Sequence, residues 1–114
     1  MILDLRRRGA NPTKLILNSP NNPTGLAIPA VELGPIVDVC ERYGVFLISD
    51  EIYALTAFAG TRQSIAAHCA GTAAVTTGLS KHLSLGGWRV GFGLVPAKEG
   101  SLLNSLNAIA SFVR

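Results

Sequence analysis

Apolar residues gather in four short segments that are separated by polar, glycine-rich or proline-rich stretches. The segments 14–18, 45–48, 73–77 and 90–95 each centre on aliphatic residues and are bounded by turn-forming residues, and the last one stops at Pro96. Their length and nearly continuous apolar character are typical of strands that are buried on both faces of a sheet. We therefore predict four strands.

The segment between the first two predicted strands has the apolar spacing of a helix. Four residues repeat at i, i+3, i+4 and i+7 and so share one face: Leu33, Ile36, Val37 and Cys40. Pro29 suits the first turn of this helix, and Gly44 is the expected residue for its C-terminal cap. Further helical segments are expected at residues 2–9, 64–69 and 102–113, with loops at 18–25 and 55–63.

The order of strands and helices predicts an α/β fold with a mostly parallel sheet. In such sheets, ligands bind beyond the carboxyl ends of the strands. Three polar clusters, at 18–25, 50–53 and 77–81, each follow the C-terminal end of a predicted strand. We therefore expect these clusters to meet at one edge of the sheet.

The composition is that of one folded domain. The chain has 114 residues, of which 48% are hydrophobic and 15% are charged, so it can bury a core. The net charge of +3 owes much to the run Arg6-Arg7-Arg8. That run lacks the aromatic residues or known motif of a nucleic-acid surface, and we expect it on a solvated helix end. No nucleic-acid partner is expected.

Two further classes of protein are excluded by what the sequence lacks. No apolar run approaches the roughly 20 residues that span a bilayer, and the N-terminus has no apolar signal-peptide core, so we expect a cytoplasmic protein without a membrane partner. Cys40 and Cys69 have no zinc spacing, and His68 and His82 have no ligand spacing. We expect Cys40 in the core, both histidines in structural or exposed positions, and no metal site.

The stretch 77–92 holds the most suggestive chemistry. Lys81 follows a turn that contains glycine and serine, and Arg89 comes eight residues later, behind Gly-Gly-Trp. Lysine forms Schiff bases with aldehydes, and arginine binds phosphate through a planar fork of donors. An aldehyde and a phosphate on one molecule describe pyridoxal 5′-phosphate (PLP). Taken alone, a lysine and an arginine in a glycine-rich turn more often belong to a solvated loop.

Three stretches together resemble a known family. Ser19-Pro-Asn-Asn-Pro-Thr-Gly25, Asp50-Glu-Ile-Tyr53 and Ser80-Lys81…Gly87-Trp-Arg-Val-Gly91 are similar, in order and spacing, to the signature stretches of class I/II (fold-type I) PLP-dependent aminotransferases. The resemblance runs over nearly the whole chain but matches only the middle of a family member. It implies that residues 1–114 are part of the three-layer, PLP-binding large domain, without the N-terminal part and the C-terminal small domain.

The resemblance implies a role for each residue of the third stretch. Lys81 corresponds to the lysine that holds PLP as a Schiff base and, once displaced by a substrate amine, moves the proton between the α-carbon and the cofactor. Arg89 corresponds to the arginine that binds the cofactor phosphate, and Ser80 to a hydroxyl that assists. Gly78 departs from the family, because many members carry a serine there for the phosphate. Thr77 or Ser80 is the candidate replacement.

The first two stretches supply the other candidates. Asp50 corresponds to the aspartate that pairs with the pyridine nitrogen, where a carboxylate favours the protonated ring. Tyr53 and Asn22 correspond to two donors to the cofactor's 3′-oxygen, and Asn22-Pro23 is a candidate cis peptide. Read in isolation, these residues are a turn aspartate, a half-buried tyrosine and a turn asparagine. Two neighbours are expected to be structural, through hydrogen bonds and through packing: Glu51 and Trp88.

The function that the resemblance implies is PLP-dependent transamination of an amino acid with a 2-oxo acid. The complete protein is expected to be a homodimer, and the fragment alone to be inactive. Two alternatives stay open: a PLP-dependent lyase, synthase or decarboxylase on the same fold, and a non-catalytic, truncated remnant. The amino donor is not identified, because the residues that grip the substrate are expected outside this chain.

Overall fold

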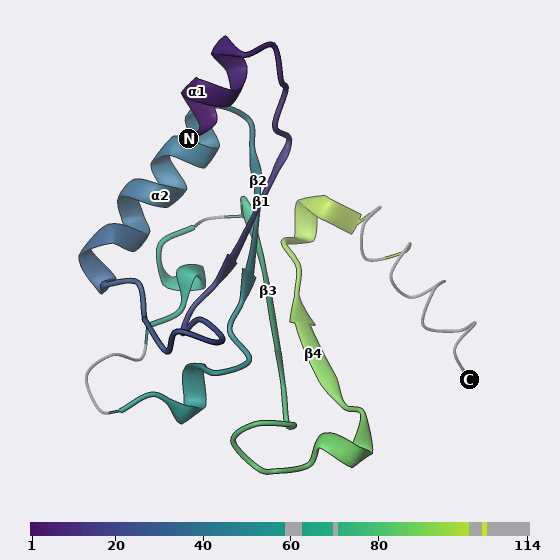
Figure 1. Cartoon of the computed structure of the whole chain (residues 1–114). Helices are drawn as coiled ribbons and strands as arrows, with labels where there is room; N and C mark the ends of the chain where they lie inside the picture. Colours follow the sequence, from purple (N-terminus) through teal and green to yellow (C-terminus); the bar gives the residue numbers. More distant parts are fainter. Residues whose placement is uncertain (59–62, 70, 101–103, 105–114) are drawn as a thin grey trace.

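The computed structural model describes residues 1–58, 63–69, 71–100 and 104. Its centre is one sheet in the order β1-β2-β3-β4 (Figure 1), formed by β1 (Lys14–Asn18), β2 (Phe46–Asp50), β3 (Ala73–Gly78) and β4 (Gly91–Leu94). The first three strands run parallel, and β4 runs antiparallel to β3. The α/β fold with a mostly parallel sheet is thus confirmed. The direction of β4 follows from its connection, since residues 79–90 return beside β3 without a crossover helix.

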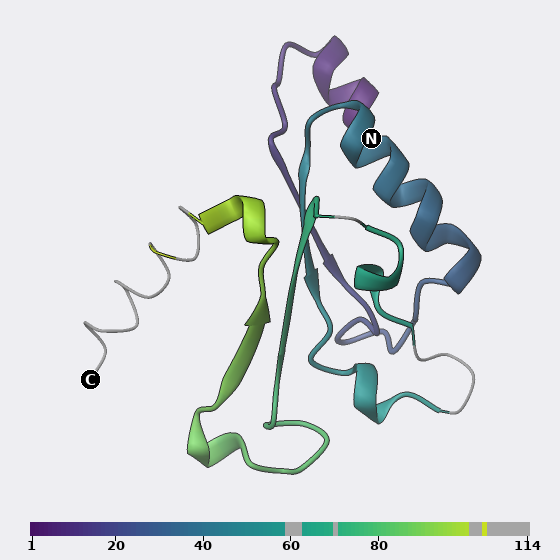
Figure 2. The same ribbon diagram turned by 180° about the vertical axis from the view of Figure 1, so that it is seen from behind.

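One face of the sheet is covered by helical elements. Helix α2 (Ala30–Arg42) and the 3₁₀ turn η2 (Ile65–Ala67) lie on the same side of the strands, as Figures 1 and 2 show from opposite directions. The predicted apolar face of α2 packs inward, with Leu33, Val37 and Cys40 buried. Gly44 adopts a left-handed φ of 62° just beyond the helix, which confirms it as the C-terminal cap.

The hydrophobic core lies between α2, η2 and this face of the sheet. Leu47, Cys40 and Ile65 are each only 1% exposed. Side chains alternate along β1, because Leu15 and Leu17 pack against the core whereas Ile16, between them, is 69% exposed. The core of the described residues is therefore one-sided, and it holds the ends of β1 and β2 in place.

The remaining elements are short. Helix α1 (Ile2–Arg7) matches the predicted segment 2–9, and the 3₁₀ turns η1 (Ala54–Thr56), η3 (Gly86–Trp88) and η4 (Ala97–Glu99) punctuate the loops. The short helix predicted at 64–69 is the single turn η2. The predicted helix at 102–113 and part of the predicted loop at 55–63 lie outside the described residues.

The arginine run lies on a solvated helix end, as predicted. Arg6 donates a hydrogen bond to the backbone oxygen of Tyr43 at 2.6 Å and lies over that ring, and Arg8 pairs with Asp4 at 3.2 Å.

Both cysteines are free, and burial raises the pKa of the Cys40 thiol above its ordinary value. Within the described parts of the chain, no helix has the length and apolarity to cross a membrane, and no cluster of potential metal ligands forms.

Candidate functional site

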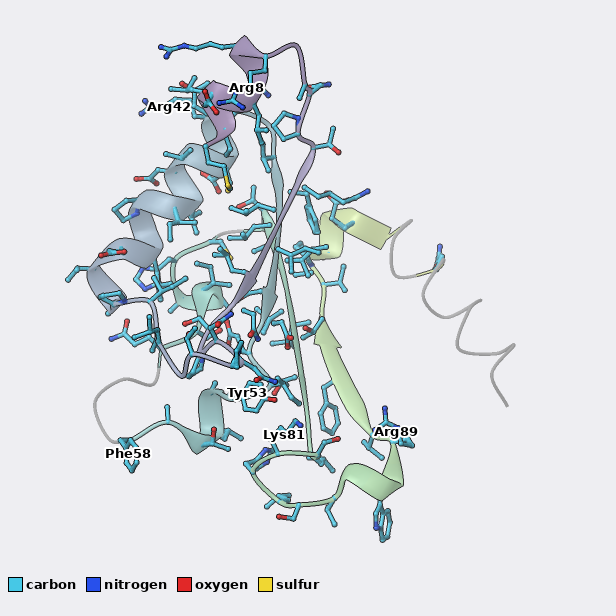
Figure 3. The ribbon with its side chains drawn as sticks, in the orientation of Figure 1. Arg8, Arg42, Tyr53, Phe58, Lys81 and Arg89 are labelled. Atoms are coloured by element: carbon cyan, nitrogen blue, oxygen red, sulfur yellow. The ribbon has the colours of Figure 1, made fainter. Side chains whose placement is uncertain are left out.

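The sheet register brings polar residues together where the strands end. Asn18 on β1 pairs with Asp50 on β2, and Asp50 pairs with Thr76 on β3, so the three residues form a row across the parallel strands. Paired residues of adjacent strands project to the same face. Tyr53 and Lys81 lie beyond this end of the sheet (Figure 3). The expectation that the three polar clusters meet at one edge is thereby confirmed.

Asp50 is held by donors on both carboxylate oxygens. Its Oδ2 accepts a hydrogen bond from the amide nitrogen of Asn18 at 3.3 Å. Its Oδ1 accepts from the backbone N–H of Ile52 at 3.3 Å and, at a longer 3.5 Å, from the hydroxyl of Thr76. The side chain is part-buried, and these donors hold the carboxylate in one plane.

Asn22 and Tyr53 form a pair although they are far apart in the sequence. The amide nitrogen of Asn22 donates to the hydroxyl of Tyr53 at 3.0 Å, which leaves the hydroxyl proton of Tyr53 available to donate elsewhere. The Nζ of Lys81 lies 5.4 Å from the centroid of the Tyr53 ring, within cation–π range. We call the set Asn18, Asn22, Asp50, Tyr53 and Thr76 the strand-end network.

Two of the predicted site residues are not joined to this network. Arg89 has a left-handed φ of 53°, is exposed, and donates to the backbone oxygen of Gly86 at 3.2 Å. Figure 3 shows its side chain beside the start of β4, apart from Lys81. Ser80 is half-buried next to Lys81 in the chain. Within the described residues, neither side chain hydrogen-bonds to the strand-end network.

The structure gives a physical reason for glycine at position 78. A Cβ atom there would lie 3.0 Å from the backbone oxygen of Val90 and 3.2 Å from Cδ1 of Ile52, which is tighter than nine in ten Cβ contacts in proteins. Gly78 faces Gly91 across the β3–β4 ladder, so the two strands come close at this point. The hydroxyl of Thr77 donates to the backbone oxygen of Glu51 at 3.5 Å. A serine at position 78 would thus require these neighbours to shift by a few tenths of an ångström.

Sequence reasoning missed two members of the network, Asn18 and Thr76. Asn18 appears in the sequence as a turn former, and Thr76 as an ordinary strand residue. The signal that was available is that each of them lies in the last three residues of its strand, as Asp50 does. Residues that end parallel strands in register face one another, and this rule would have found the row.

Several smaller expectations have clear outcomes. The Asn22-Pro23 peptide is cis, as predicted. Glu51 is buried, and its Oε1 accepts three hydrogen bonds, from the Ser49 and Ser64 hydroxyls and the Ile65 backbone N–H, so its structural role is confirmed.

The prediction that Trp88 packs structurally is wrong, because its side chain is 74% exposed in η3, beyond the end of the sheet.

The two histidines differ in their surroundings. His68 is exposed. His82 is half-buried, and its Nδ1 atom is shielded from solvent without a hydrogen-bond partner among the described residues. Both fit the expectation of structural or exposed positions.

A pocket of about 510 Å³ opens beside the Asn22–Tyr53 pair. It is lined by residues 20–23, 25–27, 53 and 56–58, and most of the lining is apolar. Asp50 and Lys81 do not line it. The site is therefore defined by the convergence of side chains rather than by this pocket.

The donors and acceptors at the strand ends fit the cofactor that the sequence suggests. Asp50 offers an oriented carboxylate to a basic ring nitrogen, and Asn22 and Tyr53 offer an amide and a phenol to a ring oxygen. Lys81 places a primary amine next to the Tyr53 ring. A flat ring with a nitrogen on one side and an oxygen and an aldehyde on the other matches this set.

Comparison with known proteins points in the same direction. Residues 3–114 match the family model described as aminotransferase class I and II. The chain is 35% identical over 86 residues to the aspartate aminotransferase of Geobacillus stearothermophilus, covering 72% of this chain and 22% of that protein. It is 41% identical over 83 residues to the valine–pyruvate aminotransferase of Mycobacterium tuberculosis, covering 72% of this chain and 21% of that protein.

A solved structure shares the fold. The crystal structure of an aminotransferase from Mycobacterium tuberculosis superposes with a TM-score of 0.68 at 37% sequence identity, covering 75% of this chain and 24% of that one. The chain thus spans less than a quarter of the length of these relatives. The family model nevertheless matches residues 3–114, almost the whole of the present sequence. The chain therefore belongs to the class I and II aminotransferase family, whose members depend on pyridoxal 5′-phosphate.

Proposed function

We propose that this chain forms the cofactor-binding part of an aminotransferase that exchanges an amino group between an amino acid and a 2-oxo acid. The observation that supports it most directly is the convergence of Asp50, the Asn22–Tyr53 pair and Lys81 beyond one end of the sheet. Residues 1–114 then form part of the large domain, and segments outside this chain supply its N-terminal part and the small domain. The complete protein acts as a homodimer in the cytoplasm.

In this proposal, the strand-end network orients the cofactor ring. The Asp50 carboxylate faces the ring nitrogen and favours its protonated form by charge. The amide of Asn22 and the phenol of Tyr53 donate to the 3′-oxygen, and their mutual hydrogen bond of 3.0 Å fixes their spacing. When bound, PLP supplies the electron sink that stabilises negative charge at the substrate α-carbon.

Lys81 has two tasks in this proposal. Its Nζ amine is the attachment point for the aldehyde carbon of the cofactor. The freed amine of Lys81 would then hold and move the proton at the substrate α-carbon. The Nζ atom lies 5.4 Å from the centroid of the Tyr53 ring, so the lysine stands at the edge of the network.

Arg89 and Ser80 bind the cofactor phosphate in this proposal. Arginine suits a phosphate because its planar donors form paired, charge-assisted hydrogen bonds. The guanidinium is exposed, and its hydrogen bond at 3.2 Å goes to a neutral acceptor, the Gly86 carbonyl, which a phosphate dianion can replace. Gly78 gives no hydroxyl to the phosphate, so Ser80 is the nearest hydroxyl in the chain to Lys81.

The names of the relatives leave the amino donor open. One acts on aspartate by name and another on valine and pyruvate, so donors of different charge occur among proteins similar to this chain. We therefore propose only the substrate classes, an amino acid and a 2-oxo acid.

Borohydride trapping tests this proposal on the 114-residue chain itself. The chain is incubated with PLP, reduced, digested and analysed by mass spectrometry, and the sequence contains three lysines, Lys14, Lys81 and Lys98. We expect selective labelling of Lys81, loss of that label in Lys81→Ala, and an unchanged label in the matched control Lys14→Ala. Equal labelling of all three lysines contradicts the assignment. Product analysis of the complete protein with and without a 2-oxo acid then separates transamination, which needs an acceptor, from lyase chemistry.

A further inference from the structure

Asn18 connects the two parts of the strand-end network. Its amide nitrogen donates to the backbone oxygen of Asp50 at 3.2 Å and to Oδ2 of Asp50 at 3.3 Å. Its amide oxygen accepts from the backbone N–H of Asn22 at 3.0 Å and from the side chain of Asn21 at 3.4 Å. One side chain thus contacts both Asp50, at the end of β2, and Asn22, in the loop after β1.

The partners determine which way the amide of Asn18 points. The backbone N–H of Asn22 can only donate, so the atom that faces it must be the amide oxygen. The backbone oxygen of Asp50 can only accept, so the atom that faces it must be the amide nitrogen. The same nitrogen therefore donates to the Asp50 carboxylate, and a flipped amide would lose every one of these hydrogen bonds.

Asn18 has a distinct effect on the Asp50 carboxylate. Ile52 and Thr76 donate to Oδ1, whereas Asn18 is the donor to Oδ2 among the described residues. Without it, donors remain on one oxygen only, and the carboxylate plane can rotate about its bond to Cβ.

We propose that Asn18 is a positioning residue of the cofactor site, which sets the plane of the Asp50 carboxylate and couples it to the Asn22 loop. This inference rests on the proposed function and deepens it. Asn18 acts through Asp50. Removal of Asn18 should therefore weaken the binding of a ligand that has a ring nitrogen more than the binding of a ligand that lacks one.

The test compares two ligands that differ at one ring atom. The first is PLP, and the second is its carbocyclic analogue, in which CH replaces the ring nitrogen. The dissociation constants of both are measured on the whole chain by quenching of intrinsic fluorescence, for the wild type and for Asn18→Ala. We expect Asn18→Ala to lower the preference for PLP over the analogue by about tenfold, the size of one lost hydrogen bond to a charged group.

An effect that weakens the binding of both ligands equally does not change the ratio of their two affinities. Loss of stability and displacement of the Asn22 loop weaken both ligands together, so they leave the ratio unchanged. Asn21→Ala is the matched control: it is an asparagine of the same loop that touches Asn18 without touching Asp50, and its ratio should equal that of the wild type. Asn18→Asp is a near-isosteric second variant that turns the donor into a carboxylate, and it should lower the ratio at least as much.

The outcomes separate this inference from the function beneath it. If Asn18→Ala weakens both ligands equally while Lys81 is still trapped by borohydride, the positioning role is overturned and the proposed function stands. If the complete wild-type protein neither binds PLP nor shows a trapped Lys81, the proposed function fails, and this inference fails with it. An Asp50→Ala variant should abolish the preference for PLP, and adding Asn18→Ala to it should change nothing further.

Discussion

The two sides of the proposed cofactor site are held in different ways. The strand-end network is held by hydrogen bonds that join β1, β2 and β3 across the sheet, as between Asn18 and Asp50. The loop 79–90, which carries Lys81 and Arg89, bonds mostly to itself and to its own base, with backbone hydrogen bonds such as Leu85 N–H to the Leu79 oxygen at 3.3 Å. Its link to the network is the position of Lys81 over the Tyr53 ring.

The difference shows how each side obtains its geometry. Parallel register places the ends of β1 and β2 together, and the buried core beneath them resists displacement, so the network is preorganised for a ligand. The loop has exposed side chains, with Leu83 54% and Trp88 74% exposed, and few contacts to hold its cations in place. We therefore expect substitutions beneath the network to cost more stability than those in or beside the loop.

The largest difference is expected between two apolar truncations. Leu47→Ala removes a side chain that is 1% exposed beneath the network and should lower the free energy of unfolding by about 2–5 kcal/mol. Phe92→Ala removes a larger side chain, but one that is 53% exposed on β4, and should cost less than about 1 kcal/mol. Urea unfolding of both variants measures the two free energies. Equal losses of unfolding free energy would contradict the proposed difference between the strand-end network and the loop 79–90.

Glu51 provides the next test, because it ties the end of β2 to η2. Glu51→Ala leaves the Ser49 hydroxyl and the Ile65 N–H without their acceptor, and should cost about 2–3 kcal/mol of unfolding free energy. Glu51→Gln keeps an acceptor oxygen of the same shape and should cost less than half as much. If both variants lose the same stability, the charge of Glu51 rather than its acceptor geometry matters.

Substitutions of two glycines compare the packing at the end of β3 with the packing in the loop 79–90. Gly78→Ser places a Cβ 3.0 Å from the Val90 backbone oxygen, and we expect a cost of about 1–3 kcal/mol from overpacking. Gly86→Ser places its Cβ in open space, with nothing within 4 Å, and should change the unfolding free energy by less than about 0.5 kcal/mol. Thermal or urea unfolding decides, and a harmless Gly78→Ser would show that β3 and β4 separate easily.

The fold was largely predictable because its signals are local. The strand predicted at 14–18 matches β1 residue for residue, and the apolar spacing of the segment from Leu33 to Cys40 defines the buried face of α2. Strand–helix–strand order also predicted the edge where Asp50 and Tyr53 lie. These features depend on neighbours within a few positions, which is what a sequence displays.

The rest of the site depends on contacts that a single sequence does not display. The bond between Asn18 and Asp50 needs the lateral register of two strands, and an asparagine before a proline-rich loop looks the same with or without that bond. Trp88 is expected to pack, yet its side chain is 74% exposed, because the burial of an aromatic ring depends on which elements lie opposite it. The direction of the Arg89 side chain follows from its left-handed backbone, for which its residue type gives no cue.

The smallest effect is expected where the two sides meet, at Tyr53. Tyr53→Phe removes the hydroxyl that accepts from Asn22 at 3.0 Å but keeps the ring beneath Lys81, and should cost about 0.5–1.5 kcal/mol of unfolding free energy. Tyr53→Leu removes the ring face as well. If the ring holds the lysine, borohydride trapping at Lys81 should persist in Tyr53→Phe and fall further in Tyr53→Leu.

The comparison of these two variants separates the two contacts of one residue. Equal trapping in both would mean that the cation–π contact contributes nothing to the position of Lys81, and that the loop is placed by its own backbone. A larger loss of trapping in Tyr53→Leu would mean that the strand-end network positions the loop 79–90 through the ring of Tyr53. That contact is exposed, and its energy is about 0.5–1 kcal/mol. We therefore expect a severalfold rather than a complete change in trapping. Lys81→Ala is the control in which trapping at this position is absent.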